Sequence, residues 1–223
     1  MDLIQALAAE LGKDPRHVEN VVRLLDEGNT IPFIARYRKE LHGAMDDTSL
    51  RTLEERLQYL RGLEDRREAV KKSIDEQGKL TDELAAAIDS AKTLAEVEDL
   101  YRPYKQKRRT RATMAKEKGL EPLAALLFAQ ERDCPRPEEA ARDFVDPEKG
   151  VETVEDALQG ASDIIAEQIS DDAAIRKSLR ALISRQGQLV SRAATEDDSV
   201  YRLYYDFTQS VARLQGHQVL AIN

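Results

Sequence analysis

Between positions 48 and 77 the apolar residues recur at spacings of three, four and seven, and charged residues fill the positions between them. Residues three and four apart share one face of an α-helix. The pattern therefore predicts one long helix near residues 48–77, of about eight turns. Its expected buried positions are Leu50, Leu53, Leu57, Leu60, Leu63, Val70 and Ile74.

Shorter patterns precede this helix. Residues 3–11 and 15–25 each place their apolar side chains on one helical face. Thr30 is a suitable N-cap for a third helix, because Pro32 follows in its first turn. Three short helices with tight turns resemble a helix-turn-helix-like subdomain, which we expect over residues 1–46.

Beyond residue 77 the pattern predicts further helices separated by turn residues. They are expected over 81–90, 93–101, 123–128, 153–169 and 172–183. Residues 132–137 contain the turn residues and prolines of a linker. The last two helices should pack against each other in antiparallel fashion. Gln188 to Ser191 is expected to be extended, as a short strand or a turn.

These elements indicate an all-α, multi-helical bundle. We expect the helix-turn-helix-like subdomain at 1–46, a helical domain at 47–192, and the start of a further segment at 193–223. Composition agrees with this fold class, because charged residues make up 34% and aromatic residues only 5% of the chain.

Composition also narrows the cellular setting. The single cysteine, Cys134, excludes an internal disulfide and is typical of a reducing, cytoplasmic compartment. The sequence contains no run of roughly 20 apolar residues, which a membrane-spanning helix would need. We therefore expect a cytoplasmic protein without membrane partners, acting as a monomer.

Positive charge is concentrated in one segment of an acidic chain. Between Arg102 and Lys118 there are eight basic residues and one acidic residue, a local charge of +7, whereas the whole chain carries −8. The remaining residues therefore sum to −15. We call residues 102–118 the basic segment.

Two interpretations of the basic segment are open. Its side chains can contact phosphates, with Tyr101 and Tyr104 as stacking or cation–π partners. Alternatively, its arginines can form bidentate pairs with carboxylates of neighbouring helices. The block from Arg36 to Glu40 allows the same two interpretations. The candidate nucleic-acid contacts are Lys105, Lys107, Arg108, Arg109, Arg111, Arg36 and Arg38.

Residues suited to catalysis are sparse. His17, His42 and His217 belong to no metal-ligand or acid–base motif. We expect His42 to lie at the end of a helix containing residues 36–40, where the helix dipole favours a cation. Cys134 is interpreted as an incidental thiol. The paired aspartates at 46–47, 171–172 and 197–198 are better suited to helix capping than to metal binding. No glycine-rich phosphate loop is present, so we expect no enzyme, metal or cofactor.

Four blocks resemble the Tex family of bacterial transcription accessory proteins, in family order. They are GNTIPFIARYRKELHGAMDD (28–47), DLYRPYKQKRRTRATMAKEKGLEPL (99–123), VEDALQGASDIIAEQIS (154–170) and YYDFTQSVARLQGHQVLAIN (204–223). The resemblance implies that the chain corresponds to the front of the family. Family members continue into RNase H-like, helix-hairpin-helix and OB-type RNA-binding domains.

The resemblance also implies a role. We expect a non-catalytic helical scaffold module of a transcription accessory protein that binds RNA or DNA, with the basic segment as a possible phosphate contact. The alternative is a protein interaction platform that docks transcription or translation machinery through its acidic helices without touching nucleic acid.

Overall fold

A computed structural model describes residues 3–106, 108–132, 134–195, 197 and 199–223 of the chain. The fold divides into two compact units, Met1–Val97 and Glu98–Asn223, and the division falls within α6 (Leu94–Tyr101). The described residues are mainly helical, with one small two-stranded sheet. The predicted all-α class is therefore confirmed. The expected three-part division at residues 46 and 192 stays a prediction, which unfolding of truncated chains would test.

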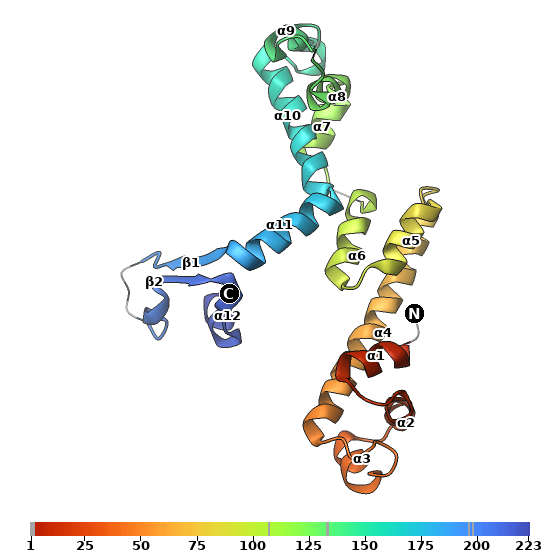
Figure 1. The fold of residues 1–223 in the computed structure, drawn as a ribbon. Coiled ribbons are helices and arrows are strands. Elements are labelled where there is room, and N and C mark those ends of the chain that lie inside the picture. Colours follow the sequence, from red (N-terminus) through yellow and green to blue (C-terminus); the bar gives the residue numbers. More distant parts are fainter. Residues whose placement is uncertain (1–2, 107, 133, 196, 198) are drawn as a thin grey trace. The chain divides into compact units, whose positions relative to one another are not determined.

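The first unit is built around one long helix. Its helices are α1 (Leu3–Leu11), α2 (Pro15–Asp26), α3 (Ile31–Tyr37), α4 (Asp47–Asp75) and α5 (Asp82–Ser90). Helices α1, α2 and α3 all pack against α4, and α5 packs nearer its C-terminal end (Figure 1). The predicted long helix is confirmed to within two residues at each end.

The core of the first unit follows the predicted apolar face. All seven of the expected α4 positions are buried. Also buried are Leu7 of α1, Val18 and Val21 of α2, and Ile31 and Ile34 of α3, on the three helices that pack against α4. Arg67 is also buried on α4, because its guanidinium donates to Glu64 Oε2 at 2.6 Å and to the carbonyl of Ala91 at 2.5 Å.

The second unit is built around α10 (Val154–Asp171). The elements before α10 are η1 (Arg102–Tyr104), α7 (Arg111–Glu117), α8 (Glu121–Ala129), α9 (Pro137–Arg142) and η2 (Pro147–Lys149). Helices α7, α8 and α9 surround one side of α10 (Figure 1). Their core is rich in alanine: Ala112, Ala115, Leu120, Leu123, Ala124, Ala140, Ala141, Val151, Ala157, Ala161 and Ile164.

Small side chains let these helices approach closely. A Cβ atom placed on Gly160 of α10 would lie 2.3 Å from Leu120 Cδ1 and 3.3 Å from the Cβ of Ala115 in α7. Glycine at this position therefore sets the distance between α10 and α7. The start of α10 is fixed by a capping box, in which Thr153 and Asp156 bond each other's backbone amides.

The chain after α10 departs from the prediction. Helix α11 (Ala173–Gln186) begins directly after the cap residue Asp172, runs away from α10 and has no buried residue (Figure 1). The predicted antiparallel packing is therefore wrong. A single extended residue, Asp172 at φ −69° and ψ 117°, separates the two helices, so the chain has no loop long enough to reverse its direction.

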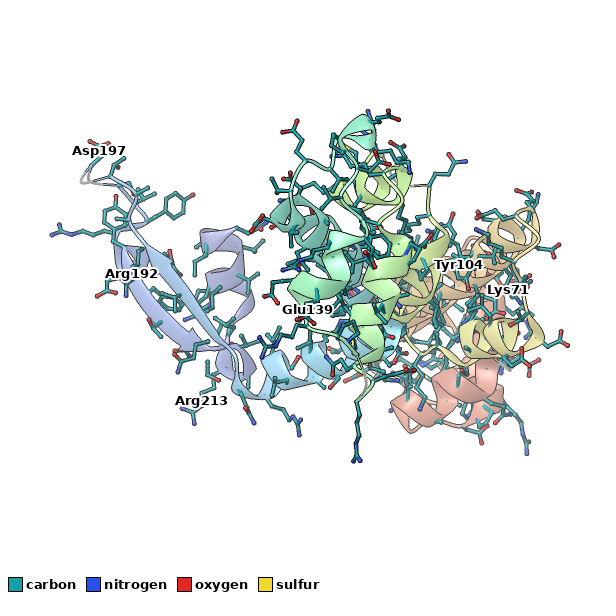
Figure 2. The ribbon with its side chains drawn as sticks, turned by 90° about the horizontal axis from the view of Figure 1, so that it is seen from above. Lys71, Tyr104, Glu139, Arg192, Asp197 and Arg213 are labelled. Carbon is teal, nitrogen blue, oxygen red and sulfur yellow. The ribbon has the colours of Figure 1, made fainter. Side chains whose placement is uncertain are left out.

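A β-hairpin and a short helix complete the second unit. Strand β1 (Gln188–Arg192) pairs antiparallel with β2 (Asp206–Ser210), with Val190 opposite Thr208. The expected extended segment at 188–191 is thus a strand. Asp197 lies at the tip of this hairpin and Arg213 at its other end (Figure 2). The remaining elements are η3 (Arg202–Tyr204), η4 (Val211–Arg213), which packs against α11, and α12 (Gly216–Ile222).

Candidate functional site

The basic segment begins next to a buried carboxylate. Asp99, in the last turn of α6, is 4% exposed. Its Oδ1 accepts a hydrogen bond from Arg176 Nε at 2.6 Å, and its Oδ2 accepts one from Arg180 Nη2 at 2.5 Å. Arg176 and Arg180 are four residues apart on α11 and so lie on the same face. We call these three residues the Asp99 clamp.

The electrostatics of the clamp favour its ionised form. Burial alone would raise the pKa of Asp99, but the hydrogen bonds and positive charges of Arg176 and Arg180 outweigh burial and lower the pKa below its ordinary value. Arg176 also donates to the carbonyl of Ser170 at 3.2 Å. The clamp therefore holds α11 to α6 and to the end of α10.

The first basic residues of the segment have acidic partners. Arg102 Nε lies 2.9 Å from Asp171 Oδ1, at the C-terminal end of α10. Lys105 forms an ion pair with Glu98 and lies 5.3 Å from the centroid of the Tyr101 ring. The interpretation as internal ion pairs therefore describes these two residues, and the expected cation–π contact involves Tyr101.

The middle of the segment is different. Arg109 pairs with Glu117 at 3.0 Å, but their side chains are 70% and 55% exposed, and such pairs contribute little to stability. The side chains of Arg108 and Arg111 are exposed and form no hydrogen bond or ion pair with any described residue. Lys107 lies outside the described residues. Within the basic segment, the predicted site residues Arg108 and Arg111 thus have guanidinium groups without a partner among the described residues.

These side chains border a hollow of about 550 Å³ between the basic segment and the last turns of α10. The lining residues are Arg102, Lys105, Gln106, Arg108, Arg109, Thr110, Glu167, Ser170 and Asp171. The structure therefore brings Lys105, Arg108 and Arg109 together around one hollow. Arg111, the first residue of α7, follows the last lining residue of the segment, Thr110, in the sequence.

Arg36 and Arg38 belong to the first unit. The expected helix through residues 36–40 is wrong in extent, because α3 ends at Tyr37 and Arg38 leaves the helical conformation at φ −130°. The following residues turn back so that His42 and Met45 can enter the core, and Gly43 and Ala44 adopt positive φ values of 59° and 56°.

His42 consequently lies past the end of α3 and not at its C-terminal turn. It is 1% exposed, and neither ring nitrogen has a hydrogen-bond partner among the described residues. The expected interaction with the α3 dipole is therefore wrong, because burial of the ring carries it into the core. His17 Nδ1 lies 3.0 Å from the carbonyl of Leu41.

One aspartate in each of the first two pairs caps a helix, as expected, whereas Asp198 of the third pair lies outside the described residues. Asp46 Oδ1 accepts from the Ser49 amide at 2.8 Å, and Asp172 Oδ1 accepts from the Ile175 amide at 2.7 Å. Asp171 instead pairs with Arg102. Among the residues that the structure describes, no group of three His, Cys, Asp or Glu side chains is arranged to hold a metal ion. The Cys134 thiol is half-buried and lies 3.9 Å from the Leu126 carbonyl.

Sequence reasoning missed the Asp99 clamp. A signal was present, because an acidic residue in the last turn of a helix opposes the helix dipole. Such a local conflict indicates a tertiary partner. The partners themselves are 77 and 81 residues away, and no local pattern identifies them.

Within the described residues, no helix is both long and apolar enough to cross a bilayer.

Comparisons with known proteins identify the family. A family model described as "Tex-like protein N-terminal domain" matches residues 1–75, and one described as "Tex central region-like" matches residues 133–222. The chain is 47% identical to YdcI of Bacillus subtilis (strain 168) over 99% of this chain and 31% of YdcI. It is 42% identical to the transcriptional accessory protein Tex of Neisseria gonorrhoeae, over 100% of this chain and 29% of that protein.

A human protein named S1 RNA-binding domain-containing protein 1 is 30% identical, over 100% of this chain and 23% of its own length. The chain thus spans less than a third of each of these relatives. The two family models together cover most of the sequence in the order that the four blocks predict. The chain therefore belongs to the Tex family, and its residues 1–75 are the family's N-terminal domain.

Proposed function

We propose that this chain is a non-catalytic helical scaffold of a transcription accessory protein, and that its basic segment adds contacts to phosphates of RNA or DNA. The relative from Neisseria gonorrhoeae is named a transcriptional accessory protein, and the human relative carries RNA binding in its name. The scaffold acts as a monomer in the cytoplasm, beside the transcription machinery.

The scaffold role is supported by the Asp99 clamp. The clamp joins α6 to α11, and the Arg102–Asp171 pair joins η1 to the end of α10. Both contacts meet at the junction between α10 and α11, where only Asp172 separates the two helices. Paired charges at this junction hold α11 in one direction, and α11 in turn positions the β-hairpin that follows it in the chain.

The phosphate role is supported by one observation above all. Arg108 and Arg111 are exposed and have no carboxylate partner among the described residues. Lys105 and Arg109 are paired, but through side chains that are 42% and 70% exposed, so a phosphate can replace those carboxylates at small cost. The −15 carried outside the segment repels nucleic acid, which limits the contact to a few phosphates.

A salt titration tests the phosphate role. Binding of fluorescent single-stranded RNA and of duplex DNA is measured by anisotropy at several salt concentrations. Each phosphate neutralised on duplex DNA contributes about −0.9 to the slope of log K against log salt. We expect Arg108→Ala/Arg111→Ala to make this slope less negative by about 0.9 for each phosphate that the two arginines no longer neutralise.

The matched control is Arg51→Ala/Arg61→Ala. It removes the same charge from exposed arginines that pair with Asp47 and Asp26. We expect this control to leave the slope unchanged. An unchanged slope in the Arg108/Arg111 variant, or an equal change in the control, contradicts the phosphate role and favours a platform that contacts only proteins.

A further inference from the structure

The surface of α3 presents an aromatic residue that the core does not use. Tyr37 is 57% exposed. Its ring lies 5.2 Å from that of Phe33 at an interplanar angle of 46°, and the Arg38 guanidinium lies 5.3 Å from the Phe33 centroid. Phe33 therefore contacts both Tyr37 and Arg38. We call Phe33, Arg36, Tyr37, Arg38 and Lys39 the α3 cluster.

The positive charges of the α3 cluster are not neutralised. Arg36 and Lys39 are exposed and form no side-chain hydrogen bond or ion pair with any described residue. The Arg38 guanidinium donates to the Tyr37 carbonyl at 3.3 Å and to no other group in the part of the chain that the structure describes. Some other surface arginines of the same unit do have carboxylate partners, as in the pairs of Arg56 with Glu10 and Arg61 with Asp26 at 2.7 Å.

The cluster is held on a rigid base. Ile31 and Ile34 on the opposite face of α3 are 3% and 0% exposed. The loop that follows is anchored by buried His42, and at Gly43 it passes so close to His17 that an added Cβ would lie 2.4 Å from the ring. A fixed backbone and a packed aromatic ring lower the entropic cost of binding a partner.

We propose that the α3 cluster is a docking site for an acidic protein segment that carries an apolar anchor residue. Tyrosine and arginine are enriched among the few residues that carry most of the binding energy of protein interfaces. The three cations of the cluster complement acidic side chains, and the Tyr37 and Phe33 rings offer an apolar surface to the anchor.

The charge of the surrounding unit favours a short protein segment over nucleic acid. Residues 1–97 contain 15 basic and 20 acidic residues, a net charge of −5. Asp46 and Asp47 follow the cluster closely in the sequence. A nucleic-acid strand gains affinity from many phosphate contacts along its length, and beyond the cluster it would meet a negative surface. A short acidic segment would end before that surface.

Fluorescence anisotropy on the whole chain tests the proposal with three labelled probes. The first is a peptide in which Glu and Asp flank one Phe and one Leu, the second replaces its acidic residues by Lys, and the third is a single-stranded RNA. We expect only the acidic peptide to bind at the cluster, and Tyr37→Ala to weaken it about tenfold or more. Arg36→Glu, at an exposed position outside the core, should also weaken it.

Tyr201→Ala and Arg51→Ala are the matched controls, because Tyr201 is 54% exposed and Arg51 is an exposed arginine paired with Asp47. Neither should change binding of the acidic peptide. The proposal is overturned if the acidic peptide does not bind, or if it binds equally well to Tyr37→Ala and Arg36→Glu. It is also overturned if the RNA, and not the peptide, loses affinity in these two variants.

Discussion

Arg176 donates from Nε to Oδ1 of Asp99 over 2.6 Å, although the two residues are 77 positions apart in the sequence. The Asp99 side chain is only 6% exposed, whereas that of Arg176 is 33% exposed. The contact therefore places a buried carboxylate against arginines that reach it from the surface. The predicted effects of Asp99→Asn and of acid on the second unit both depend on this difference in exposure between the carboxylate and its arginine partners.

Removing the charge of Asp99 should destabilise the second unit. In Asp99→Asn, Arg176 and Arg180 lose their ionic partner, and we expect a loss of about 2–3 kcal/mol in the free energy of unfolding. This is less than the roughly 3–5 kcal/mol for a fully buried pair, because the arginines are partly exposed. Urea denaturation followed by circular dichroism measures the change. Asp26→Asn, which breaks an exposed pair with Arg61, should cost under about 1 kcal/mol.

The same carboxylate predicts a loss of stability in acid. The two arginines lower the pKa of Asp99 in the folded protein below its ordinary value of 3.8, against the opposing effect of burial. A lowered pKa stabilises the fold above the unfolded-state pKa, and this stabilisation is lost as pH falls through the folded-state pKa. We expect the decline to begin near pH 4 and to be shallower in Asp99→Asn. Equal acid sensitivity of the two proteins in thermal melts would contradict this prediction.

Replacing glycine by alanine should change the stability of the fold in opposite directions at two helical positions. Gly160→Ala places a methyl group against Leu120 and Ala115, and we expect it to destabilise the fold by about 1–3 kcal/mol through overpacking. Gly62, within α4, has no atom within 4 Å of the added Cβ apart from its chain neighbours and the nearby backbone of α4 itself. Gly62→Ala should therefore stabilise the fold by about 0.5–1 kcal/mol through helix propensity. Melting temperatures of the two variants measure the contrast, and a loss of the same size in both would be inconsistent with it.

The N-cap of α10 should contribute to the stability of the fold independently of the helix packing at Gly160. Thr153 accepts from the Asp156 amide at 3.1 Å, and Asp156 accepts from the Thr153 amide at 3.1 Å. We expect Thr153→Ala to cost about 1 kcal/mol in unfolding free energy. Thr153→Ser keeps the hydroxyl group and should cost much less. If both substitutions cost the same, the capping hydrogen bond is not the source of the stabilisation.

Local patterns predicted the long helix well. The seven apolar positions of α4 recur with helical spacing and are all buried, because one face of a long helix needs only one packing surface. A helix was likewise expected over 93–101, and α6 spans Leu94–Tyr101 with a 3-10 turn following. Where local chemistry decides the structure, the sequence was sufficient.

Other features depend on distant partners. Helix α9, Pro137–Arg142, was not predicted, because its buried residues are Ala140 and Ala141 and alanines carry little periodic signal. The direction of α11 was predicted wrongly, because only Asp172 separates it from α10 and because two α11 arginines pair with Asp99, which lies 77 and 81 positions earlier in the chain. In the basic segment, Arg102 and Lys105 form ion pairs, whereas Arg108 and Arg111 have no partner among the described residues. No local sequence pattern indicates which of these residues are paired.

The most direct test of the phosphate role follows individual arginine side chains by nuclear magnetic resonance. The Nε–Hε signals of the arginines are recorded while single-stranded RNA is added to the whole chain. We expect the signals of Arg108 and Arg111 to shift with RNA concentration, and those of Arg56 and Arg61, which are held by Glu10 and Asp26, to stay in place. RNA binding that leaves the Arg108 and Arg111 signals unmoved would contradict the phosphate role.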